Sequence, residues 1–208
     1  MSKIKRADLD ILVIGSGAAG IAASIEAVSR GARVKIVEQA PSWGGTAIIS
    51  GGGVFMVDTP LQRELGIQDS INLASEDWEQ WSNGTADMEW AHYYIERSCT
   101  DLYEWTKKLG VRWIEVKLEE GNSVPRWHRP QGRGREILEC IHREAIRVGT
   151  RDWTFSTNVK KLLRDESGRV SGAELQQKTG TKTIEAKTVL VATGGFCSNH
   201  DMVQRYLP

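Results

Sequence analysis

The sequence predicts an α/β fold that starts with a βαβ unit, continues through a helical insertion and ends in a small antiparallel β-meander. Three observations predict it. A β-branched run at residues 9–14 ends at a glycine and is followed by a helical pattern and a second β-branched run. Helical spacing recurs between residues 69 and 148, and turn signals divide residues 154–191 into β-prone segments. We expect the chain to form one domain over residues 1–208.

The βαβ unit rests on local patterns. Residues 9–14 predict a buried strand, because the run is short, rich in β-branched residues and stopped by Gly15. Residues 18–30 predict a helix with apolar residues along one face and Gly31 at the position of a left-handed C-terminal cap. Residues 33–37 form a second β-branched run. Strand, glycine turn, helix and strand in this order predict a right-handed βαβ unit.

The middle of the chain is predicted to be mainly helical. Residues 41–53, PSWGGTAIISGGG, are an exception, because each glycine weakens a helix by about 1 kcal/mol. Beyond them, helical patterns cover residues 69–81, 86–109 and 137–148, and a glycine follows the second and the third.

The last part of the chain is predicted to be rich in strands. Residues 165–168 and 178–180 have turn-forming compositions and separate β-prone runs between residues 154 and 191. Adjacent runs joined by short turns predict an antiparallel meander, and the final run, residues 188–191, leads into the sequence ATGG.

Composition excludes several classes of function. Twenty-seven basic residues balance twenty-seven acidic ones, so no net charge favours nucleic acid or an anionic membrane as a partner. No stretch reaches the apolar length of a membrane span, and Asp8 and Asp10 interrupt any signal-like run near the N-terminus. Cys99, Cys140 and Cys197 lie far apart, which indicates neither a disulfide framework nor a metal site. We therefore expect a cytoplasmic protein without a bound metal.

A glycine motif joins the first strand to the first helix. Residues 15–20, GSGAAG, fit the pattern G-x-G-x-x-G, in which the first glycine allows the tight turn, the second lets the backbone approach a pyrophosphate, and the third allows close packing of helix on strand. Glu38 ends the second strand, where a carboxylate accepts hydrogen bonds from ribose hydroxyls. Together they predict a Rossmann-type dinucleotide site.

The motif alone does not distinguish FAD from NAD. The glycine-rich residues 44–53 favour FAD, because they offer many backbone donors with little side-chain bulk, and a flat isoalloxazine ring requires such close backbone approach. An NAD dehydrogenase more often continues directly into a further βα unit. A surface loop without a ligand is the alternative reading of this segment.

Several segments together resemble one family. VIGSGAAGIAASIEA, VEQAPSWGGTAIISGGGVF and VLVATGGF are similar to flavin-binding segments of the fumarate reductase/succinate dehydrogenase flavoproteins, which include flavocytochrome c fumarate reductases and ketosteroid dehydrogenases. SVPRWHRPQGRG resembles a segment of the fumarate reductase branch. The resemblance spans nearly the whole chain and implies a Rossmann-like FAD-binding domain.

The resemblance also implies which residues meet FAD. A first group would contact the pyrophosphate and the adenosine ribose: Gly15, Ser16, Gly17, Ala18, Ala19, Gly20, Glu38, Gln39 and Ala40. A second group would surround the flavin: Gly44, Gly45, Thr46, Ser50, Gly51, Gly52 and Gly53, with Thr46 near flavin N5. A third group would meet the adenine through backbone atoms or close the site: Val159, Ala192, Thr193, Gly194 and Gly195.

Two departures from the family pattern matter. Succinate dehydrogenases attach FAD through a histidine that precedes the position of Thr46, and this chain has Gly45 there, so we expect non-covalent FAD. Family enzymes are also more than twice as long. The missing part contains a capping domain that supplies substrate-binding and proton-donating residues, and a C-terminal segment that completes the flavin site. The chain thus corresponds to the N-terminal portion of such an enzyme.

The implied reaction moves a hydride between flavin N5 and a carbon next to a carbonyl or carboxylate of a small-molecule substrate. No proton donor stands out. His128 is a candidate because an imidazole titrates near neutral pH, but it is more readily explained as a loop histidine that shapes its segment. Arg126 and Arg129 could pair with a carboxylate substrate, but we expect them to be solvated. Three readings remain open: an FAD-dependent oxidoreductase, a non-catalytic truncated flavin-binding fragment and an NAD-binding Rossmann dehydrogenase. Candidate partners are a separately encoded second half and an electron-transfer protein.

Overall fold

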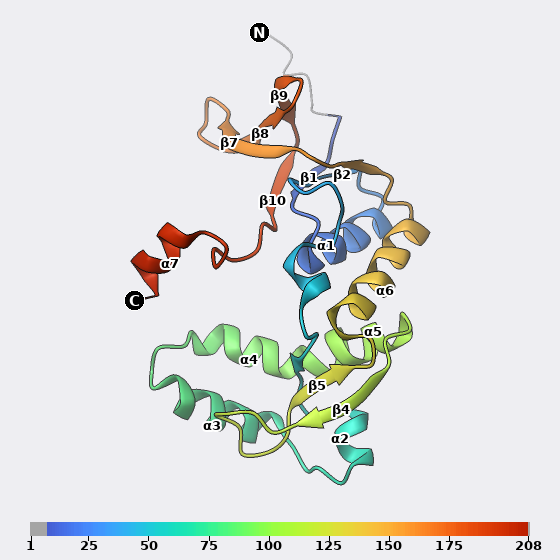
Figure 1. Ribbon diagram of the computed structural model, residues 1–208, viewed down its shortest axis with the longest axis vertical. Helices are drawn as coiled ribbons and strands as arrows, with labels where there is room; N and C mark the ends of the chain where they lie inside the picture. The colour runs from blue at the N-terminus through green and yellow to red at the C-terminus, as the bar shows by residue number, and fades with distance from the viewer. Residues whose placement is uncertain (1–7, 208) are drawn as a thin grey trace. The chain divides into compact units, whose positions relative to one another are not determined.

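The computed structural model describes residues 8–207, which divide into two compact units. The first unit combines the residues up to Thr46 with those from His142 onward, and the second covers Ala47–Ile141 (Figure 1). The first unit contains two sheets and the second one sheet, and each unit has its own hydrophobic core.

A four-stranded parallel sheet forms the centre of the first unit. Its order is β10-β1-β2-β6, and its strands are β1 (Ile11–Ile14), β2 (Val34–Val37), β6 (Asp152–Thr154) and β10 (Thr188–Val191). Helix α1 (Ala18–Ser29) connects β1 to β2, and Gly31, with φ of +82°, follows its end in a left-handed conformation. The predicted βαβ unit is therefore confirmed.

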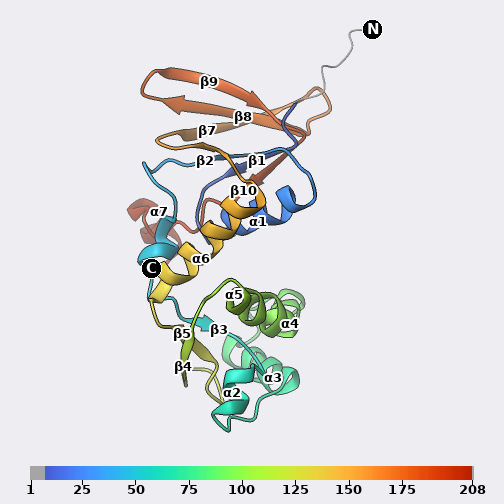
Figure 2. The same cartoon turned by 90° about the vertical axis from the view of Figure 1, so that its right-hand side faces the viewer.

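The two faces of the parallel sheet are covered differently, as Figure 2 shows. One face packs against an antiparallel meander of β7 (Asn158–Arg164), β8 (Val170–Gln177) and β9 (Gly180–Glu185), through a core that contains Leu12, Val37, Ala173 and Leu175. The other face packs Val13, Val34 and Ile36 against apolar residues of α1. Burial on both faces explains why β1 and β2 are short apolar runs. The predicted meander is confirmed.

The second unit contains helices around a three-stranded antiparallel sheet of order β3-β5-β4. The strands are β3 (Val54–Phe55), β4 (Trp113–Lys117) and β5 (Trp127–Pro130). The helices are α2 (Pro60–Glu64), α3 (Ile71–Ser82), α4 (Met88–Arg97), the π-helix η2 (Ser98–Glu104) and α5 (Trp105–Lys108). Phe55 and Trp78 pack against buried Val57, Ala74 and Ile95.

Three helical segments complete the described chain. The 3₁₀ helix η1 (Gly45–Ile49) and helix α6 (Arg133–Val148) each contain residues of both units, and α7 (His200–Tyr206) follows β10. The predicted helices at residues 69–81 and 137–148 are confirmed. The single helix predicted at residues 86–109 is wrong in one respect, because its middle turns form the π-helix η2; the run still ends at Gly110, whose φ is +105°.

Candidate functional site

The carboxyl ends of three neighbouring strands carry most of the predicted site residues. Because β10, β1 and β2 are adjacent and parallel, the residues that follow them lie at one edge of the sheet. These residues are Gly15–Gly20 after β1, Glu38 after β2 and Ala192–Gly195 after β10. Ligands of open α/β sheets bind at this edge. The structure thus brings together three segments that are far apart in sequence.

The three glycines of the turn after β1 have different surroundings. A Cβ on Gly15, whose φ is +102°, would overlap the carbonyl group of Ala192, and a Cβ on Gly20 would overlap the carbonyl oxygen of Gly15. A Cβ on Gly17 would meet no atom within 4 Å. Gly15 and Gly20 are therefore required by packing, whereas Gly17 borders open space. This arrangement fits a pyrophosphate beside Gly17.

Helix α1 begins at this open space. Gly17 is its N-cap residue, and no side chain caps the helix by a hydrogen bond. The first N–H groups of a helix have no intrahelical partners, and the helix dipole places partial positive charge there. Among the described residues, the N-terminus of α1 therefore has unpaired N–H groups and partial positive charge, which suit an anion such as a phosphate group.

Glu38 makes contacts that the sequence did not reveal. Its Oε2 accepts hydrogen bonds from the backbone N–H and the hydroxyl of Ser16, at 2.8 and 2.9 Å, and its Oε1 accepts from the N–H of Ala40 at 2.9 Å. The residue is only 7% exposed. A carboxylate has about four acceptor positions, so room remains for a ribose hydroxyl. Ser16 thus fixes the turn to Glu38.

A loop of the first unit runs along the backbone of Glu38. The N–H of Glu38 donates to the carbonyl of Thr154, and the N–H of Thr157 donates to the carbonyl of Glu38, each at 2.9 Å. Thr157 is buried, and Val159 follows it in β7 with its side chain against the sheet core. The contribution of Thr157 was not predicted, because no motif marks a loop that closes across more than a hundred residues.

The second glycine segment lies against the first. Gly44, with φ of +116°, donates its N–H to the carbonyl of Ser16 at 2.9 Å, and a Cβ on Gly45 would stand 3.5 Å from the Cα of Gly17. Thr46 is exposed at the start of η1. Gly44 and Gly45 therefore lie next to the open space at Gly17, and their contact with the flavin remains a prediction.

The glycines at residues 51–53 belong to the second unit. A Cβ on Gly52, whose φ is +74°, would overlap the backbone at Arg133 and Gly134, and a Cβ on Gly53 would overlap the ring of Trp127. The hydroxyl of Ser50 accepts from the N–H of Gly52 at 3.2 Å. Gly52 and Gly53 are therefore required for packing within their own unit, whereas a Cβ on Gly51 would meet no atom within 4 Å. The role of all three glycines at the flavin remains a prediction.

The segment around His128 is buried rather than solvated. Arg126 is fully buried, and its guanidinium donates to Asp69 at 2.8–3.0 Å and to Asp77 at 2.5 Å. The expectation of a solvated Arg126 is therefore wrong, because two carboxylates of α3 and of the loop before it pair with it. Arg129 pairs with Glu115 and is 34% exposed at its side chain.

His128 is held as a structural residue. Its Nδ1 lies 2.7 Å from the carbonyl oxygen of Arg126, and its Nε2 lies 2.7 Å from the hydroxyl of Thr59. The carbonyl can only accept, so Nδ1 carries the proton and Nε2 accepts from Thr59. Burial lowers the pKa of His128 below its ordinary value. Both ring nitrogens of His128 are therefore engaged by protein groups.

This burial predicts a pH dependence of stability. The unfolded chain takes up a proton on His128 below about pH 6.5, and the folded protein, with its lowered pKa, resists that proton. The contribution of the neutral ring to stability is therefore present above pH 6.5 and is lost as the pH falls toward the folded pKa. We expect the difference in unfolding free energy between the wild type and His128→Gln to shrink between pH 7 and 5, measured by urea denaturation. An unchanged difference would contradict this protonation state.

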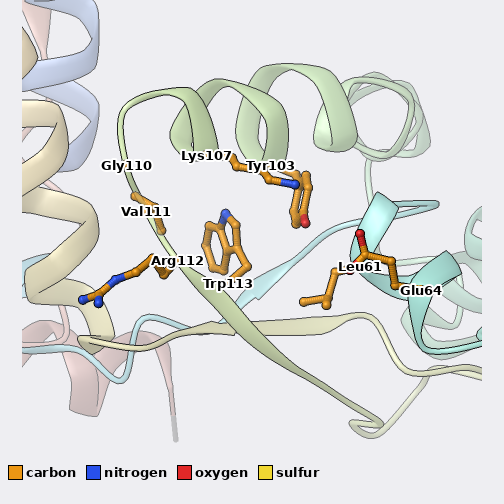
Figure 3. Close-up of a pocket in the computed structure, with 8 residues that line it drawn as sticks. All are labelled: Leu61, Glu64, Tyr103, Lys107, Gly110, Val111, Arg112 and Trp113. Carbon is orange, nitrogen blue, oxygen red and sulfur yellow. The ribbon is translucent and has the colours of Figure 1, made fainter.

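The second unit also contains a pocket of about 370 Å³ (Figure 3). Tyr103 and Trp113 stack in it with ring centroids 6.3 Å apart, and Lys107 Nζ lies 5.3 Å from the centre of the Tyr103 ring. The side chain of Arg112 extends away from Trp113 and pairs with Glu136. None of the residues predicted to bind FAD lines this pocket.

No helix among residues 8–207 is long and apolar enough to cross a bilayer.

Comparison with known proteins decides the family. Residues 10–208 match the family model described as FAD binding domain. The chain belongs to this family of FAD-binding domains. Its cofactor is thus FAD, in agreement with the geometry of the turn at Gly17 and of Glu38.

The relatives of this FAD-binding domain are oxidoreductases. It is 35% identical to a probable fumarate reductase, Ifc3, of Shewanella frigidimarina, over 95% of this chain and 34% of the relative. It is 33% identical to a KsdD-like steroid dehydrogenase of Mycolicibacterium smegmatis, over 97% of this chain and 43% of the relative. The chain therefore spans less than half the length of these curated relatives.

Solved structures agree with the fold. The open conformation of a flavocytochrome c3 fumarate reductase superposes with a TM-score of 0.88 at 33% identity, covering 97% of this chain and 36% of that one. A 3-ketosteroid-Δ4-(5α)-dehydrogenase from Rhodococcus jostii RHA1, in complex with 4-androstene-3,17-dione, superposes with a TM-score of 0.86 at 28% identity, covering 98% and 50%.

Proposed function

We propose that this chain is the FAD-binding part of an oxidoreductase of the fumarate reductase/succinate dehydrogenase type, and that it holds FAD without a covalent bond. One observation carries the proposal: Gly17 borders open space at the start of α1, while the buried carboxylate of Glu38 lies at the end of the neighbouring strand. An anion-binding helix end beside a carboxylate suits a dinucleotide.

Individual residues then have separate roles. The pyrophosphate and ribose would be held by Gly15, Ser16, Gly17, Ala18, Ala19, Gly20, Glu38, Gln39 and Ala40. The flavin would lie against Gly44, Gly45, Thr46, Ser50, Gly51, Gly52 and Gly53, while Val159, Ala192, Thr193, Gly194 and Gly195 would border the dinucleotide elsewhere. Because Ser16 already donates to Glu38 through both its N–H and its hydroxyl, its part is to fix the turn. The phosphates would then be bound by the N–H groups at the start of α1.

Bound flavin supplies hydride transfer to or from a carbon–carbon bond next to a carbonyl or carboxylate. Fumarate reductases and steroid dehydrogenases among the relatives motivate this substrate class. Within residues 8–207 we assign no side chain to proton transfer, because His128 is buried and has both ring nitrogens engaged. The part of the protein that selects the substrate is proposed to come from a further segment or from a partner chain.

Reconstitution tests the cofactor. The purified chain should bind FAD with a flavin absorbance spectrum and release it on acid precipitation, since Gly45 stands where related enzymes carry a tethering histidine. A chain that FAD cannot reconstitute but that binds NAD would contradict the proposal. Dye-coupled turnover of fumarate or a 3-ketosteroid by this chain alone would exclude a non-catalytic fragment.

Glu38→Gln should weaken FAD binding by roughly 1–3 kcal/mol, because a hydrogen bond to a charged group is lost. Fluorescence titration measures the dissociation constant. Glu26→Gln, on the exposed surface of α1, is the control and should bind FAD as the wild type does. Ser16→Ala keeps the Glu38 carboxylate but removes the serine hydroxyl that donates to it. This variant therefore tests the positioning of the turn separately from the contact between Glu38 and the ribose. Wild-type affinity in Glu38→Gln would disprove the ribose assignment.

A further inference from the structure

An aromatic column crosses the first unit beside the second glycine segment. The ring of Trp43 stacks on the ring of His142 with centroids 4.0 Å apart and an interplanar angle of 6°. His142 also contacts Trp153, at 5.4 Å, and Trp153 stacks on Phe155 at 6.1 Å. A near-parallel pair at 4.0 Å is the closest ring contact among the described residues.

One end of this column is the chain that enters the flavin segment. Trp43 directly precedes Gly44, whose N–H donates to Ser16, and Gly45, which lies against Gly17. Both glycines have positive φ, and Pro41 and Ser42 before them are exposed. A glycine backbone is the most flexible in the chain, so it needs an anchor to hold one conformation. Trp43 is the large side chain that can supply it.

The next two residues of the column lie on regular elements. His142 lies on α6 between buried Ile141 and Ala145, which fix that turn of the helix. Trp153 lies on β6, where it pairs with Ile36 of β2, and its Nε1 donates to the carbonyl of Thr150 at 3.2 Å. A side chain stacked on regular elements is placed more accurately than one held by a loop.

We propose that Trp43 and His142 are positioning residues for the flavin end of the cofactor. Their stack ties the segment Gly44–Thr46 to α6 and β6, and so keeps it beside the glycine turn. This inference rests on the proposed function, because it assumes that Gly44–Thr46 meets the flavin. Neither residue needs to touch the cofactor. The adenosine end, at Glu38, is held by Ser16 and Ala40 and does not need the stack.

The experiment compares FAD with ADP, which lacks the flavin. His142→Ala and Trp43→Ala should each weaken FAD binding about three- to tenfold, the size of one aromatic pair, and leave ADP binding unchanged. His142→Phe retains a flat ring and should restore the FAD affinity. Trp90→Ala removes an exposed tryptophan of the second unit and should change neither constant. Thermal unfolding of each apoprotein shows whether it is folded.

The outcomes separate the inference from the proposed function. Equal loss of FAD and ADP affinity in His142→Ala, or failure of His142→Phe to restore FAD binding, overturns the positioning role alone. So does unchanged FAD affinity in both alanine variants. A wild-type chain that binds ADP but not FAD contradicts the proposed function together with the inference.

Discussion

Gly20→Ala is expected to destabilise the first unit by about 3 kcal/mol or more, and Gly17→Ala to leave it folded but unable to bind FAD. A Cβ at Gly20 would overlap the carbonyl oxygen of Gly15, and backbone cannot move aside as a flexible side chain does. A Cβ at Gly17 meets no protein atom and, with φ of −76°, no backbone strain. Urea denaturation and FAD titration measure the two effects.

A third glycine serves as the control for backbone conformation. Gly31 has φ of +82°, and a Cβ there would meet nothing within 4 Å, so Gly31→Ala should show only the strain of about 1–2 kcal/mol that a left-handed residue costs. It should bind FAD normally once folded. If Gly17→Ala retained wild-type FAD affinity, the pyrophosphate would have to lie elsewhere.

Arg126→Leu should destabilise the second unit by about 3–5 kcal/mol, because it leaves the buried carboxylate of Asp69 and that of Asp77 without their cation. Leucine fills part of the volume of the arginine side chain, so the loss would reflect charge more than an empty cavity. The measurement is the unfolding free energy from urea denaturation at neutral pH.

Arg129→Leu is the matched control. Arg129 also pairs with a carboxylate, that of Glu115, and lies three residues away, but it is one-third exposed. Ion pairs that solvent reaches contribute little to stability, so the variant should lose less than about 1 kcal/mol. Equal effects of the two substitutions would show that burial does not determine how much the Asp69–Arg126–Asp77 cluster contributes to the free energy of unfolding.

Local patterns were enough to predict β1, α1, β2 and the meander of the first unit, but not β6 or α7. Strands β1 and β2 are buried on both faces and therefore read as apolar runs, and Gly31 marks the end of α1 in the sequence as it does in space. The meander was predicted from its turns, which contain glycines at positive φ, Gly168 and Gly180. Each of these signals lies within a few residues of the element that it predicts.

Much of the second unit could not be predicted in this way. Strand β3 has only two residues, and its partner β5 is more than seventy residues away, so neither run carries a pattern of its own. The short helix α2 was missed too, although Thr59 and Gln62 form a capping box at its start. That pair of residues is a sequence signal for a helix N-terminus that the periodicity did not bring out.

The candidate site shows the same division. The glycines and Glu38 follow from a motif, because the phosphate and ribose require particular residues at fixed spacing. The contacts of Ser16 with Glu38 and of Trp43 with His142 join residues 22 and about a hundred positions apart, and only the folded chain reveals them. Arg126 was misjudged because an arginine in a loop shows no sign of burial until its acidic partners are placed beside it.

With three donors already on its carboxylate, Glu38 has its rotamer fixed before any nucleotide arrives. Ordering a mobile side chain costs about 0.5–1.5 kcal/mol on association, and here folding has met that cost. We therefore expect the Glu38 carboxylate to keep the same orientation with and without a bound ribose. Adenine nucleotides in general, not FAD alone, would therefore bind to a preformed ribose site. The glycine segment that begins at Gly44 would then discriminate FAD from the other nucleotides.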